Sequence, residues 1–160
     1  MKSFHDKSGN AWIIEINVRQ IRTVRALLNV DLANLITFND KGQPETDLLD
    51  KISNDPCLLV DIIFALCKDQ AESKNIDSEK FAENIDGDTI EAATVALLEE
   101  MTDFFPEAKR RVLRVILDYA QKQARQAAET LTRIVESPEF QQNLENQLTK
   151  SSSTAAGSSD

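Results

Sequence analysis

The stretch SFHDKSGNAWIIEINV, residues 3–18, decides the first element of the fold. From Trp12 onward, apolar and polar residues alternate with the period of two that is typical of a half-buried strand. The segment DKSG at 6–9 suits a type I turn followed by a left-handed glycine, which would pair Phe4 with Trp12 across the strands. Because two strands alone are only marginally stable in water, we expect this β-hairpin to be packed against other elements. Its outer edge could then pair with a strand of a partner or of a second copy, or the hairpin could serve only to cover the core.

The sequence after the hairpin is predicted to be mainly helical. Asn17 suits the N-cap of a helix over 18–28. Asp55 and Pro56 suit the N-cap and first position of a helix reaching about residue 69, which is apolar nearly all round and belongs in the middle of a bundle. The inner face of the first helix is predicted to hold Val18, Ile21, Val24 and Leu28. A short helical turn is predicted at 31–36 and a loop or small hairpin at 38–47. Further helices are predicted over 47–53 and in a short segment that begins after Asp77 or Ser78. Two longer helices are predicted from Asp86 or Asp88 to about 105 and from Pro106 to about 136.

These elements define the predicted fold class and domain organisation. We expect an α+β fold that is mostly α, in which an N-terminal β-hairpin packs on a bundle of five or six helices, followed by a C-terminal helical extension. The core domain is predicted to span residues 1–120, the extension residues 121–149, and a tail without stable structure residues 150–160. The core face of the long helix from Pro106 is predicted to hold Val112, Val115, Ile116 and Tyr119.

The extension carries an apolar surface that the core has little room to cover. Its middle, QKQARQAAET at 121–130, offers only alanines for burial. We therefore expect residues 121–149 to pack against another chain, either a second copy in a homo-oligomer or a helical partner, although folding back along the bundle is the alternative. The candidate partner-binding residues are Leu131, Ile134, Val135, Phe140, Leu144 and Leu148.

The net charge of −9 is concentrated in one part of the chain. Residues 45–105 hold 16 acidic residues against 4 lysines, a balance of −12. Binding of nucleic acid is not expected, since phosphate recognition needs a positive surface. A basic protein partner fits the acidic segment, and so does a solvated face that keeps the chain soluble. Arg19, Arg22 and Arg25 on the helix over 18–28 form either a partner-binding patch or a solvated face paired with the acidic segment.

No pattern in the sequence predicts catalysis, a cofactor or a metal site. His5 is the only histidine, and the Asp86-x-Asp88 start of a calcium loop is followed by Ile90 where a ligand is required. Cys57 and Cys67 would lie roughly 15 Å apart on one helix, too far for a disulfide, and are expected to be buried and reduced. The longest apolar run, CLLVDIIFALC, is short for a membrane span and contains an aspartate, and no signal segment is recognisable, so a cytoplasmic location is expected.

Taken in order, these pieces resemble one protein family. The pieces are the hairpin FHDKSGNAWIIEINV, the helix VRQIRTVRALLNVDL, the apolar helix NDPCLLVDIIFALC, the spaced Asp77, Glu79 and Phe81, and the acidic helix DTIEAATVALLEEMTDFFP. The chain resembles the tail assembly chaperones of long-tailed phages and prophages over roughly residues 3–118. The resemblance implies a non-catalytic assembly factor in the host cytoplasm that binds the tape measure protein and recruits tail tube subunits. The alternative is a stand-alone acidic helical adaptor or inhibitor that binds a basic protein.

Overall fold

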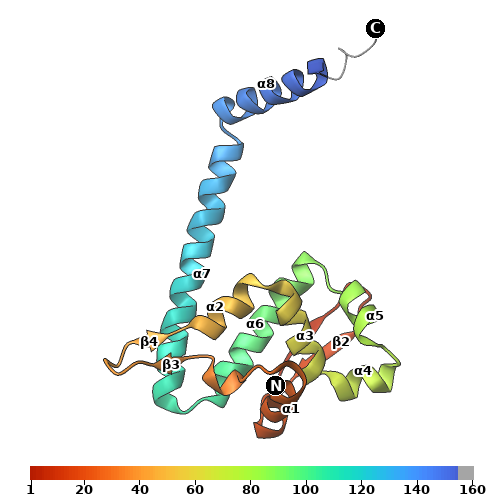
Figure 1. Cartoon of the computed structure of the whole chain (residues 1–160), viewed down its shortest axis with the longest axis vertical. Coiled ribbons are helices and arrows are strands. Elements are labelled where there is room, and N and C mark those ends of the chain that lie inside the picture. The colour runs from red at the N-terminus through yellow and green to blue at the C-terminus, as the bar shows by residue number, and fades with distance from the viewer. Residues whose placement is uncertain (155–160) are drawn as a thin grey trace. The chain divides into compact units, whose positions relative to one another are not determined.

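The computed structural model describes the backbone of residues 1–154 and the side chains of residues 1–150. It confirms the predicted fold class, because 71% of the chain is helical and an N-terminal antiparallel hairpin packs on a helix bundle (Figure 1). The strands are β1 (Lys2–His5), β2 (Ala11–Ile14), β3 (Thr37–Phe38) and β4 (Pro44–Glu45). The α-helices of the described residues are α1 (Val18–Leu28), α2 (Asp47–Asn54), α3 (Pro56–Leu66), α4 (Lys68–Lys74), α5 (Ser78–Glu83), α6 (Gly87–Phe104), α7 (Glu107–Val135) and α8 (Pro138–Thr154), with a 3-10 turn at Leu32–Asn34.

The chain divides into two compact units. The first unit is Met1–Arg114 and holds both hairpins, helices α1 to α6 and the first turns of α7. The second unit begins at Val115, whereas the sequence predicted the boundary near residue 120. Helix α8 reaches Thr154, so the first residues of the predicted unstructured tail are helical, and the rest of that tail, 155–160, lies outside the described residues.

The N-terminal hairpin has the predicted register and is packed on one face. Phe4 lies opposite Trp12, and both side chains are buried together with Ile14. The Trp12 ring meets the ring of Phe81 from α5 edge-on, with centroids 4.8 Å apart, a geometry that aromatic pairs favour. The hairpin therefore supplies one side of the core, which is why a two-stranded sheet is stable here.

Helix α6 lies along β1 and adds polar contacts to this packing. Its buried Glu100 places one carboxylate oxygen 3.0 Å from the N-terminal ammonium group of Met1 and accepts a 3.5 Å hydrogen bond from the Ile16 N–H with the other. Lys2 forms a 3.0 Å ion pair with the neighbouring Glu99, which raises the pKa of the lysine. These contacts fix the start of the chain on α6.

The two hairpins are built on the same turn. In the first, Asp6 Oδ1 accepts hydrogen bonds from the N–H groups of Ser8 and Asn10 at 3.0 and 2.9 Å. In the second, Asn39 Oδ1 accepts from the N–H groups two and four residues later, at 3.0 Å each. Each turn ends in a glycine with positive φ, 82° at Gly9 and 73° at Gly42, a conformation that glycine adopts without strain.

Local capping signals predicted the starts of α1 and α3, and for α5 and α6 the structure selects Asp77 and Asp86 from the two candidates that the sequence offered for each. The side chains of Asn17, Asp55, Asp77 and Asp86 each accept a hydrogen bond from the backbone N–H three residues later, at 2.8–3.1 Å. These bonds satisfy N–H groups that have no partner within the helix. The hydrogen bond from the Thr89 N–H is also the largest cause of the lowered pKa of Asp86.

Helix α3 occupies the middle of the bundle, as its apolar composition predicted. Ile62 and Ile63 are buried, and α3 packs against α1, α2, α5 and α6. The helix ends earlier than expected, because the chain leaves helical geometry at Cys67 and restarts as α4 at Lys68. The sequence prediction of one helix to about residue 69 therefore missed a break.

Four predicted burials are wrong, and the helical geometry explains each one. Val18 is 64% exposed because it lies roughly 90° around α1 from the buried stripe of Ile21, Val24 and the half-buried Leu28. Cys57 is exposed because it lies on the opposite face of α3 from the buried isoleucines. Val115 and Tyr119 are exposed because the buried contact of α7 is made by Leu113.

Candidate functional site

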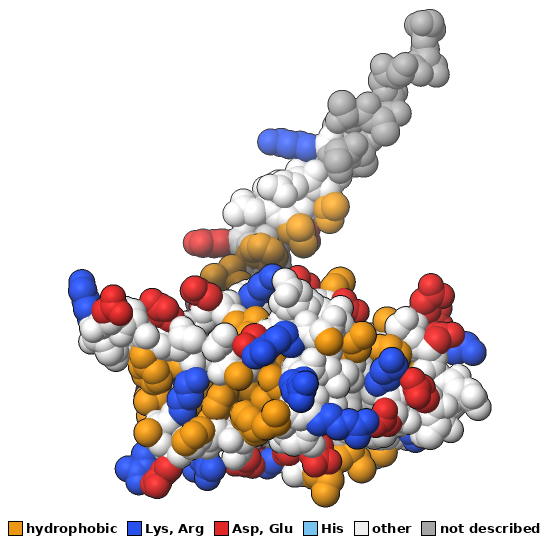
Figure 2. Space-filling model, turned by 60° about the horizontal axis from the view of Figure 1, so that its bottom comes forward, with side chains coloured by type: hydrophobic (Ala, Val, Ile, Leu, Met, Phe, Trp, Pro, Cys, Tyr) orange, Lys and Arg blue, Asp and Glu red, His pale blue; other side chains and the backbone are white. Residues whose placement is uncertain are grey.

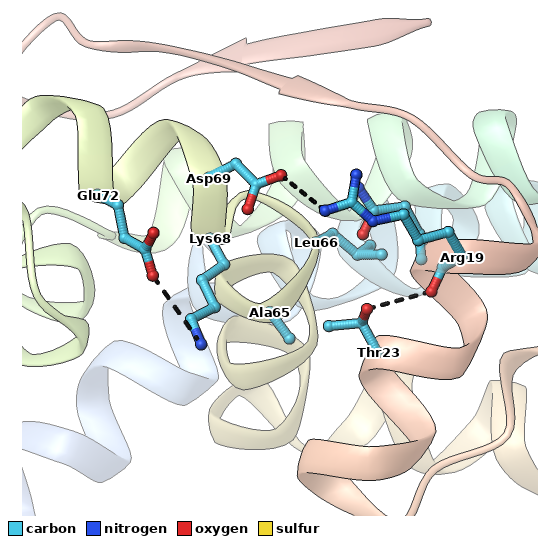
Figure 3. A pocket seen from close by; sticks show the side chains of 8 residues that line it. Arg19, Thr23, Ala65, Leu66, Lys68, Asp69 and Glu72 are labelled. Carbon is cyan, nitrogen blue, oxygen red and sulfur yellow. Dashed lines mark hydrogen bonds and ion pairs between the residues drawn. The ribbon is translucent and has the colours of Figure 1, made fainter.

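The predicted arginine surface lies beside a small pocket in the first unit. The pocket has a volume of about 220 Å3 and is formed by α1, the end of α3 and α4 (Figure 3). Arg19 reaches across it to Asp69 at 3.4 Å, and Lys68 pairs with Glu72 along α4 at 3.9 Å. The lining residues are Arg19, Gln20, Thr23, Ala65, Leu66, Lys68, Asp69 and Glu72.

The chemistry of this pocket is that of a solvated surface. The side chain of Arg19 is 79% exposed and its partner Asp69 is 71% exposed, so their attraction is weakened by water. Ala65 and Leu66 are the apolar residues of the lining. The Arg19–Asp69 ion pair therefore links α1 to α4, and the pocket offers a small polar contact surface.

The three predicted arginines differ in their surroundings. Arg19 pairs with the acidic segment, as one of the two interpretations predicted. Arg25 instead forms an ion pair with Asp31, in the connection that follows α1. Arg22 is exposed between them. In Figure 2, basic and acidic side chains are mixed over the visible face of the first unit, with hydrophobic side chains between them.

The second candidate surface is the apolar side of the C-terminal helices. All of the large apolar residues predicted there are exposed, with Leu131 at 62%. Hydrophobic side chains are visible along this segment in Figure 2. The exposed residues are Leu131, Ile134 and Val135 on α7 and Phe140, Leu144 and Leu148 on α8. That another chain covers them stays a prediction.

The outer edge of β2 is closed by a side chain that sequence reasoning missed. The amide of Gln70 on α4 accepts a hydrogen bond from the Ile13 N–H at 3.0 Å and donates one to the Ile13 carbonyl at 2.8 Å. A partner strand at this edge would have to displace both bonds, so strand addition at β2 is disfavoured. Gln70 lies 57 residues from Ile13, and no local signal links the two.

Buried polar groups in the first unit serve the structure. Burial raises the pKa of the Cys67 thiol to about 12, and its Sγ donates to the Ile13 carbonyl oxygen at 3.6 Å.

Among the residues that the structure describes, no three His, Cys, Asp or Glu side chains are grouped so as to hold a metal ion. Within that same part of the chain, no helix has both the length and the apolar character needed to cross a membrane.

Comparison of the chain with protein-family models, curated proteins and solved structures finds no match.

Proposed function

We propose that this protein is a non-catalytic tail assembly chaperone of a long-tailed phage or prophage, which binds the tape measure protein and recruits tail tube subunits in the host cytoplasm. The observation that carries the proposal is the apolar side of α8, where Phe140, Leu144 and Leu148 are exposed to water. Exposed apolar patches of this kind mark protein-binding surfaces in soluble proteins. The order of hairpin, arginine-bearing helix, apolar helix and acidic helix supports the assignment to this family.

The shape of the apolar surface fits a helical partner. Phe140, Leu144 and Leu148 recur every fourth residue and therefore lie on one side of α8. An amphipathic helix binds such a side by burying its own apolar residues against it. A long helical tape measure protein offers many such segments, so several copies of the chaperone can bind along it.

Co-expression with the neighbouring genes tests the proposal. A tape measure gene just downstream and a tail tube gene upstream are expected. The full-length chain, tagged and co-expressed with that tape measure protein, should retain it on an affinity column. A double variant Phe140→Glu and Leu144→Glu should lose at least about 90% of the captured partner, because charges cannot be buried in an apolar contact.

A matched control separates this surface from general charge effects. Gln142 lies on the opposite side of α8 from Leu144, so Gln142→Glu should capture the tape measure protein as the unmodified chain does. Equal capture by the double variant and the control would contradict the role assigned to this surface. Absence of capture by the unmodified chain would contradict the proposed partner.

The alternative function, an acidic adaptor or inhibitor of a basic protein, is favoured by a different surface. Glu79, Glu83, Asp88 and Glu91 are all exposed on α5 and the first turns of α6. Binding through these carboxylates would weaken steeply with added salt, whereas apolar binding through α8 would not. A neighbourhood of restriction or transcription genes, with salt-sensitive binding to their product, would favour this alternative.

A further inference from the structure

The second half of α7 carries a regular apolar seam with the spacing of a coiled coil. We use the term seam for Leu117, Ala120, Ala124, Ala127, Leu131 and Ile134, whose steps are alternately three and four residues. Steps of three and four sustained over several turns place side chains on one stripe that faces a partner helix. Leu117 is half-buried and the other five residues are exposed. The seam is roughly 25 Å long at 1.5 Å per residue.

The residues that flank the seam are uncharged. The positions beside a coiled-coil stripe set the choice of partner through their charges. Here Gln121, Gln123, Ala128 and Thr130 fill them. Every charged residue between 117 and 136 lies on the outward side of the helix, namely Asp118, Lys122, Arg125, Glu129, Arg133 and Glu136. A helix with the same sequence therefore meets the seam without like-charge repulsion.

The sizes of the seam residues make it self-complementary in the antiparallel direction. When two copies align about a point between Ala124 and Ala127, these two alanines meet at the centre, Ala120 meets Leu131, and Leu117 meets Ile134. Each Leu131 then faces a small residue, so that the two helices approach closely and interlock. A parallel pair would stack three successive alanine layers and would align the two helix dipoles unfavourably.

We propose that a second copy of this chain packs antiparallel along the seam and forms a two-fold symmetric dimer. A two-fold axis uses the same surface on both chains, which is the symmetry most soluble dimers adopt. The contact removes Leu131, Ile134 and the adjacent Val135 of both chains from water. The Phe140, Leu144 and Leu148 side of α8 is not used by this contact, so the dimer goes beyond the proposed binding of the tape measure protein and does not depend on it.

Sedimentation velocity of the full-length chain over a range of concentrations tests the dimer. The unmodified chain should sediment as a reversible dimer. Ala124→Glu places two charges at the centre of the seam and should weaken dimerisation at least about 100-fold. Gln126→Glu adds the same charge on the outward side and should leave dimerisation unchanged. Far-UV circular dichroism should show equal helix content in both variants.

Disulfide trapping tests the orientation. In a Cys57→Ser background, chains carrying Leu117→Cys and chains carrying Ile134→Cys are mixed and oxidised. The antiparallel dimer should give mainly the mixed Leu117→Cys to Ile134→Cys disulfide. Disulfides mainly between identical variants would overturn the antiparallel arrangement. A monomer at every concentration would overturn the proposed dimer. A dimer equally stable with Ala124→Glu and Gln126→Glu would overturn the seam as its contact surface.

Discussion

Replacing Asp6 by Asn should unfold the first unit more easily, although the two side chains are nearly the same size. Asp6 is 5% exposed and uses both carboxylate oxygens. Oδ1 accepts from the backbone N–H groups of Ser8 and Asn10, and Oδ2 accepts from Asn10 Nδ2 and Trp12 Nε1 at 2.9 Å each. An Asn side chain keeps the first oxygen but turns an NH2 group towards two donors. The indole N–H of the buried Trp12 is then left without an acceptor.

The magnitude follows from the bonds that are lost. Hydrogen bonds to a charged acceptor contribute about 1.5–3 kcal/mol each, and a buried donor without a partner costs about 1–3 kcal/mol. The amide of Asn10 can rotate to present its oxygen, which recovers part of the loss. Asp6→Asn should therefore lower the free energy of unfolding by about 2–4 kcal/mol, a large share of the roughly 5–15 kcal/mol typical of a domain.

The second hairpin provides the matched control. Asn39 holds the same kind of turn as Asp6 through its amide oxygen, and its Nδ2 donates a 3.4 Å hydrogen bond to the exposed Gln43 side chain. The reverse change, Asn39→Asp, keeps this oxygen at the surface and should alter the free energy of unfolding by less than about 0.5 kcal/mol. Urea unfolding followed by Trp12 fluorescence measures both variants. Equal effects of the two changes would refute the importance of the second carboxylate oxygen.

The effect of Asp6→Asn should also depend on pH. Burial by itself raises the pKa of Asp6, but the hydrogen bonds from Asn10, Trp12 and Ser8 together outweigh it, so the pKa lies below its ordinary value of 3.8. The charged carboxylate therefore stabilises the fold above about pH 4, and this contribution is lost as the pH falls through the lowered pKa. The stability difference between the two proteins should narrow over that acid range. A difference that stays constant on acidification would contradict this assignment.

Three further changes follow from the packing. Ile62→Ala should cost about 2–5 kcal/mol in urea unfolding because the side chain is fully buried, whereas a cost below about 1 kcal/mol would place Ile62 outside the core. Gln70→Ala should speed hydrogen exchange of the Ile13 amide at least about tenfold, since that N–H loses its acceptor; unchanged exchange would show that the bond is not maintained in solution. With a thiol reagent at pH 8, Cys57 should react in the folded protein, while Cys67 should react only after unfolding because it is buried and its pKa is raised to about 12; equal rates for the two thiols would contradict their placement.

Features set by neighbouring residues were predictable from the sequence. The caps at Asn17 and Asp55 depend on a side chain and an N–H three residues away, and the turn at 6–9 fixed the hairpin register. The burial of Val18 and Cys57 was predicted wrongly because it depends on which side of the helix the bundle covers. Apolar spacing defines a stripe only to within about a quarter turn of the helix.

Contacts between distant residues were beyond sequence reasoning. The closing of β2 by Gln70 joins positions far apart in the chain. Asp6 was predicted only as a turn residue. The alternation of the strand already directs Trp12 to the core, where its indole N–H needs an acceptor. The sequence therefore contained a reason to look for the Asp6 carboxylate as that acceptor. The exposed apolar residues of α7 and α8 were predicted from composition, since six large apolar residues in the extension exceed what the core has room to cover.

The closed edge of β2 has a consequence for how copies of the protein meet. The Gln70 side chain carries the donor and acceptor of one peptide unit, so it behaves as a third strand that is a single residue long. Sheets grow by templating at an open edge, and such growth is hard to reverse once many strands have joined. Copies gathered through their C-terminal helices would bring hairpins to high local concentration. A side chain that ends the sheet at this edge removes one route by which such copies could join irreversibly through their hairpins.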